Sequence, residues 1–81
     1  MTLTLTLYTT DHCELCDRAF DWLLQCEAVR GAQLETVDVS TSDDLMQRFG
    51  TRIPVLLIRG QPLDWPFSEA GIEKLMANPA G

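Results

Sequence analysis

The N-terminal segment, residues 1–8, alternates apolar with polar side chains: Leu3, Leu5 and Leu7 are separated by threonines. An apolar residue at every second position is typical of a strand that packs one face against a core. The segment also contains no basic residue. The pattern therefore predicts a strand that ends near Tyr8, rather than a signal peptide.

The next segment changes to helical spacing. Residues 9–12, Thr-Thr-Asp-His, supply side chains that cap helices. Apolar residues then recur at intervals of three and four, and they are Leu15, Ala19, Phe20, Trp22, Leu23 and Cys26. We expect this first helix to end at Arg30 and Gly31, because glycine is the commonest residue just beyond a helix C-terminus.

Two further elements follow. Residues 34–39 are partly β-branched and bounded by polar residues, which predicts a second strand. Residues 40–44, Ser-Thr-Ser-Asp-Asp, combine N-cap residues with the acids that favour a first helical turn. A short second helix is expected from there to Gly50.

The C-terminal third carries a strand pair and a helix. Residues 54–58, Pro-Val-Leu-Leu-Ile, form a continuous apolar run, as expected for a central strand covered on both faces. Residues 59–62 predict a turn into a brief edge strand. Phe67 precedes Ser68, and Ile72 follows four residues later, which fits a hydrophobic staple around the N-cap of a third helix.

The expected order is β-α-β-α-β-β-α in one domain, residues 1–81, with no internal repeat or linker. Two helical crossovers predict parallel pairing in the first part, and the turn near Gly60 predicts an antiparallel hairpin in the second. The fold class is therefore α/β, with a four-stranded mixed sheet flanked by three helices.

Composition narrows the choice of partners and compartment. The 81 residues are 46% hydrophobic and carry a formal net charge of −6, which disfavours nucleic acid and anionic membrane surfaces as partners. No apolar run approaches the roughly 18 residues that span a bilayer. Three cysteines are too few and too odd in number for a secreted disulfide framework, so a reducing cytoplasm is the expected location.

The candidate chemistry lies in Cys13-Glu14-Leu15-Cys16, where a strand gives way to a helix. Residues three apart on a helix are neighbours, so a small adjustment brings the two sulfurs within bonding distance. Cys13 falls at the helix N-terminus, where free N–H groups and the helix dipole stabilise a thiolate. We therefore predict Cys13 as the nucleophile and Cys16, one turn further, as the resolving thiol, with no metal at the site.

The sequence resembles the glutaredoxins and, more broadly, the oxidoreductases of the thioredoxin fold, in a divergent, bacterial-type form. The resemblance covers most of the chain and rests on the strand before the motif, Cys13-x-x-Cys16, Val37-Asp38-Val39 and Thr51-Arg52-Ile53-Pro54-Val55. It implies an enzyme that reduces or exchanges disulfides. It further implies that Pro54 is cis and faces the cysteines, and that the backbone of Ile53 pairs with the bound substrate.

The chain departs from the glutaredoxin pattern around the glutathione site. Glu14 and Leu15 replace the family's proline and aromatic residue, and neither a basic residue before the motif nor a Gly-Gly pair after the last strand is present. Arg52 and the helix N-terminus at Ser68 are the groups available for glutathione carboxylates. No tightly bound cofactor is expected, and electrons would come from glutathione, a reductase or another dithiol. The substrate would be a protein or a small molecule that contains a disulfide.

Several residues have a second interpretation. His12 and Glu14 are candidates for tuning Cys13, but they also suit an exposed loop and a first helical turn. Cys26 falls on the apolar face of its helix and is expected to be a small core residue. Zinc lacks ligands beyond His12 and the two motif cysteines. A non-catalytic binding module and a metal or iron-sulfur carrier remain the alternatives to a redox enzyme.

Overall fold

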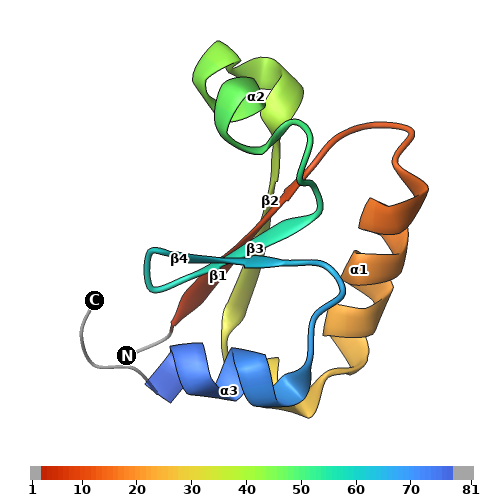
Figure 1. The fold of residues 1–81 in the computed structure, drawn as a ribbon. Helices are drawn as coiled ribbons and strands as arrows, with labels where there is room; N and C mark the ends of the chain where they lie inside the picture. The colour runs from red at the N-terminus through yellow and green to blue at the C-terminus, as the bar shows by residue number, and fades with distance from the viewer. Residues whose placement is uncertain (1–2, 78–81) are drawn as a thin grey trace.

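A four-stranded mixed sheet forms the centre of the computed structural model, which describes residues 3–77 (Figure 1). Its strands are β1 (Thr4–Thr9), β2 (Gln33–Asp38), β3 (Val55–Ile58) and β4 (Gln61–Asp64), in the order β2-β1-β3-β4. The α-helices are α1 (Glu14–Gln25), α2 (Asp43–Phe49) and α3 (Glu69–Ala77), and short 3-10 helices occupy η1 (Glu27–Val29) and η2 (Val39–Thr41). The predicted α/β class, element order and sheet are confirmed.

The direction of β3 corrects the prediction of parallel pairing across both crossovers. β1 and β2 are parallel, but β3 runs antiparallel to β1, with Tyr8 opposite Val55, and β4 is antiparallel to β3. The seven residues of α2 span only about 10 Å, too little to carry the chain back along the sheet. The chain therefore leaves β2 and enters β3 at the same end of the sheet, where α2 lies (Figure 1).

Two apolar clusters lie on opposite faces of the sheet. On one face, α1 and α3 cover β1 and β3, and the buried residues there include Leu5, Leu7, Ala19, Leu23, Leu56, Ile58 and Ile72. On the other face, Val39, Phe49 and Val55 form a smaller cluster with Tyr8 and Ile53 packed against it. The alternation predicted for the first strand therefore separates the two faces, with Leu5 and Leu7 on one and Tyr8 on the other.

The first helix ends earlier than predicted. α1 stops at Gln25, Cys26 is extended (φ −81°, ψ 120°), and η1 follows before Gly31, whose φ is +86°. An α-helix continued to Arg30 would place that arginine one turn beyond buried Cys26, on the core side. The break leaves Arg30 exposed and lets Ala28 and Val29 pack on the core.

The C-terminal part follows the predicted turn and cap. Arg59 and Gly60 both have positive φ, 50° and 81°, as a two-residue hairpin turn requires. The Ser68 hydroxyl accepts a hydrogen bond from the backbone N–H of Gly71, and Phe67 and Ile72 are buried on either side of this cap. Within residues 3–77, no helix combines the length and the apolar character needed to cross a membrane.

Candidate active site

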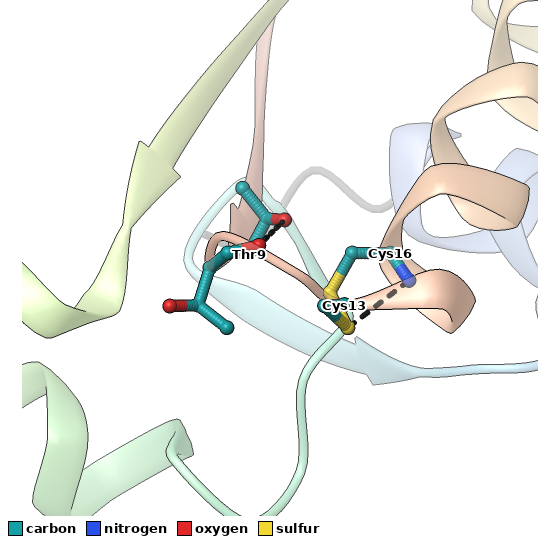
Figure 2. Close-up of a disulfide and its surroundings, with 4 residues drawn as sticks. Thr9, Cys13 and Cys16 are labelled. Carbon is teal, nitrogen blue, oxygen red and sulfur yellow. Dashed lines mark hydrogen bonds between the residues drawn. A yellow bond between two sulfur atoms is a disulfide. The ribbon is translucent and has the colours of Figure 1, made fainter.

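The loop between β1 and α1 places Cys13 at the start of the helix. His12 adopts a left-handed conformation (φ 58°) and Cys13 is extended (φ −109°, ψ 102°), so Cys13 becomes the N-cap of α1. Its Sγ accepts a hydrogen bond of 3.2 Å from the backbone N–H of Cys16 (Figure 2). The sulfur thus occupies the position that serine or aspartate takes at ordinary helix starts.

Cys13 and Cys16 are joined by a disulfide, and their Cα atoms lie 5.2 Å apart (Figure 2). The two cysteines differ in exposure: Cys13 is half-buried, whereas only 2% of Cys16 is exposed. Leu15, between them, is exposed. An incoming molecule therefore reaches Cys13 more readily than Cys16, and the spacing allows the bond to open and close.

Pro54 enters the sheet at the same end as the disulfide, since β1 leads into the cysteine loop just after the Tyr8–Val55 pair. The Ile53–Pro54 peptide bond is cis, as the resemblance implied. Pro54 is buried and Ile53 is half-buried. The N–H groups of Arg52 and Ile53 both donate to the carbonyl oxygen of Phe49, at 2.8 and 3.0 Å. This arrangement fixes the loop to the end of α2.

Arg52 is already engaged by an acid of the same chain. Its Nε and Nη2 donate to Oδ1 of Asp64 at 3.1 and 3.0 Å, across the hairpin of β3 and β4. The sequence could not show this pairing, because it depends on the strand register that sets Val55 opposite Asp64. The group predicted to hold a glutathione carboxylate is therefore occupied by a carboxylate of the protein.

The two candidate tuning residues occupy different surroundings. Glu14 pairs with Arg18 one turn along α1 at 3.3 Å, and both side chains are largely exposed. His12 is exposed and, together with Cys16, lines an open cavity of about 790 Å³ between α1 and the sheet. The cavity was not predicted, because its lining residues come from β1, the loop after β1, α1 and β2. The negative charge of the cavity could have been found from Asp17 and Asp21, which lie one helical turn apart.

Cys26 is distinct from the disulfide. Only 4% of it is exposed, and its Sγ lies 3.7 Å from Oε1 of Glu69 at the start of α3. Burial raises the pKa of the Cys26 thiol, and the adjacent Glu69 carboxylate acts in the same direction. The predicted role as a core residue agrees with this position. Across residues 3–77, no three His, Cys, Asp or Glu side chains are grouped so that they could hold a metal ion.

The sheet order, the disulfide at the start of α1 and the cis-proline before β3 together define a thioredoxin-fold protein. The glutaredoxin-like domain model (DUF836) matches residues 4–77, and the chain belongs to this family. Comparison with curated proteins gave no significant match.

Two solved structures of one bacterial protein are similar to this chain. The X-ray structure of Northeast Structural Genomics target protein XcR50 from X. campestris is 35% identical, with a TM-score of 0.70 over 86% of this chain and 91% of that one. The solution structure of the same target has a TM-score of 0.67, with 35% identity over 86% and 87% of the two chains. These similarities support the fold and the family.

Proposed function

We propose that this protein is a thiol-disulfide oxidoreductase that reduces or exchanges disulfides through Cys13 and Cys16. The observation that carries the proposal is the position of Cys13, half-buried at the N-cap of α1 and bonded to a buried Cys16. In the reduced protein, the N–H of Cys16 and the helix dipole favour the thiolate of Cys13. The thiolate is the form that attacks disulfides.

The first step is attack of the Cys13 thiolate on one sulfur of the substrate disulfide. The Cys13–substrate bond forms, the substrate S–S bond breaks, and the second substrate sulfur leaves as a thiolate that takes a proton from solvent. Ile53 and Pro54 would position the substrate beside Cys13. The N–H of Ile53 is engaged with Phe49, so the carbonyl oxygen of Ile53 is the backbone group that would accept from the substrate.

The second step releases the product. Cys16 loses its proton to solvent, and its thiolate attacks Cys13 Sγ. The Cys13–Cys16 bond forms, the mixed disulfide breaks, and the remaining substrate sulfur leaves as a thiolate that takes a proton from solvent. Two electrons have then passed from the cysteine pair to the substrate, and the Cys13–Cys16 disulfide has re-formed. An external dithiol, a reductase or two molecules of glutathione must reduce it again, which suits a reducing cytoplasm.

The test is a set of three single substitutions in the full chain. Cys16→Ser should accumulate mixed disulfides, Cys13→Ser should abolish exchange, and Cys26→Ser, the matched control, should keep exchange within about twofold of wild type. The measurement is exchange with bis(2-hydroxyethyl) disulfide, with adducts identified by mass.

Three outcomes contradict the proposal. Exchange that survives in Cys13→Ser would remove the nucleophile assigned here. A wild-type pair that never exchanges would favour a non-catalytic binding module, and coloured protein after oxygen-free purification would favour an iron-sulfur carrier.

A further inference from the structure

The disulfide borders a cavity whose base is apolar and whose rim is acidic. Buried Leu7 and Cys16 form the base. The rim carries four aspartates, which are Asp11 in the cysteine loop, Asp17 and Asp21 on α1, and Asp38 at the end of β2. The cavity opens beside the proposed redox centre, because Cys16 is part of its base.

The described side chains that line this cavity are more acidic than basic. Among residues 3–77, no lysine or arginine lines the cavity, and His12 is the titratable side chain that lines it besides the aspartates. Arg18, on the next position of α1, is paired with Glu14. Hydrogen bonds from Ser40 lower the pKa of Asp38, which keeps this carboxylate ionised. A molecule that approaches the disulfide from this side therefore meets a negative field.

We propose that the substrate of this site is a disulfide flanked by a lysine or arginine, and that the cavity receives that basic side chain. The inference rests on the proposed function. Lysine and arginine have apolar stems and charged ends, so the stem suits the base at Leu7 and the charge suits the aspartate rim. A disulfide flanked by acids, or an anionic one such as glutathione disulfide, is repelled by the same rim.

The probes are three disulfide-bonded peptides that differ in a single residue next to the cysteine: lysine, glutamine or glutamate. The rate of exchange with reduced wild-type protein is measured at low and at high salt. At low salt, the lysine peptide should react about fivefold faster than the glutamine peptide, as expected for two or more exposed charge pairs. The glutamate peptide should be slower than glutamine. High salt should reduce these differences, because it screens exposed charges.

The test variant is Asp21→Asn with Asp38→Asn, neither of which is in the proposed redox step. Asparagine keeps the side-chain oxygen that accepts from Ser40 at position 38. The matched control is Glu35→Gln with Glu73→Gln, which removes the same charge elsewhere. Glu35 is exposed and alternates with Thr36 and Asp38 along β2, so it faces away from the cavity.

We expect the ratio of the exchange rates of the lysine and glutamine peptides to fall toward one in the test variant and to stay as in wild type in the control. An unchanged ratio in the test variant would overturn the inference. An equal fall in both variants would overturn the cavity as the cause and assign the effect to net charge. If the double variant folds poorly, the single variant Asp21→Asn, at an exposed helix position, replaces it in the test. It should give about half the change in the ratio.

The two proposals fail in different ways. If none of the three peptides exchanges with wild-type protein, the proposed function fails and this inference fails with it. If all three exchange at the same rate, at low as at high salt, the redox function stands and the inference alone is wrong.

Discussion

Replacing Phe49 by leucine tests whether the end of α2 positions the loop that leads into Pro54. Phe49 is 2% exposed, and its ring stacks on Tyr8 with centroids 4.6 Å apart. The guanidinium groups of Arg48 and Arg52 lie 4.9 and 5.7 Å from the ring centroid. The Phe49 carbonyl also accepts from Arg52 and Ile53. The ring and the backbone carbonyl of Phe49 therefore hold residues 52–53, the segment before the cis-proline, in place.

The expected cost follows from these contacts. A buried hydrophobic exchange of similar volume costs up to about 1.5 kcal/mol. Loss of the aromatic pair adds about 0.5–1.5 kcal/mol, and the exposed cation-π contacts add about 0.5 kcal/mol. The total free energy of unfolding should fall by about 2–3 kcal/mol, against roughly 4–12 kcal/mol for a domain of this size. The variant should still fold, with a Tm lower by about 10–20 °C.

Urea unfolding and disulfide exchange measure the two consequences separately. We expect Phe49→Leu to slow exchange by about tenfold, because small displacements of a positioning loop have large effects on rate. Ile72→Val is the control: it removes one methyl group from the other cluster, at a cost of about 0.5–1.5 kcal/mol, and should leave exchange unchanged. A stability loss below about 1 kcal/mol, or equal exchange rates in the two variants, would refute the reasoning.

Three further predictions concern single side chains. Burial raises the pKa of the Cys26 thiol, so the folded protein holds this proton more tightly than the unfolded chain does. The free energy of unfolding should therefore fall as pH rises above about 8.5, and Cys26→Ala should flatten that decline, measured as urea midpoints. Hydrogen bonds from Ser40 lower the pKa of Asp38. The stability that they give is present above about pH 4 and is lost as pH falls through the lowered pKa of the folded protein. Asp38→Asn should therefore reduce the loss of stability in acid, measured as the urea midpoint against pH. Asp64→Asn frees Arg52 and should lower the KM for glutathione, with a stability loss below about 1 kcal/mol; an unchanged KM would show that the ion pair does not limit glutathione binding.

The sequence predicted those features that depend on neighbours along the chain. The leucine-threonine alternation, the Ser68 cap and the position of the cysteine pair at a helix start are all local, and the structure contains them. The direction of β3 depends on how far α2 carries the chain, and the early end of α1 depends on which residues reach the core. Neither distance nor burial can be read from a local pattern.

The same distinction applies to the site. The cysteine pair carries a strong local signature, so sequence alone was enough to locate it. The Arg52–Asp64 ion pair depends on the β3–β4 register. The acidic cavity is formed by β1, the loop between β1 and α1, α1 and β2. Residues from separate segments come together only in the folded chain. The sequence therefore predicted the cysteine pair at the start of a helix, and the structure added what surrounds it.

The most direct test of the redox assignment is equilibration of the purified wild-type protein with graded dithiol and disulfide buffers, with free thiols counted by alkylation and mass. Cys13 and Cys16 should become alkylated together in one two-electron transition, with Cys26 unchanged throughout. The acids Asp11, Glu14 and Asp17 oppose a thiolate at Cys13, so we predict a potential between about −200 and −270 mV, in the range of glutaredoxins and thioredoxin. A potential near −120 mV, as in a strong oxidant, would contradict the charge argument. A pair that does not respond to any buffer would contradict the proposed function itself.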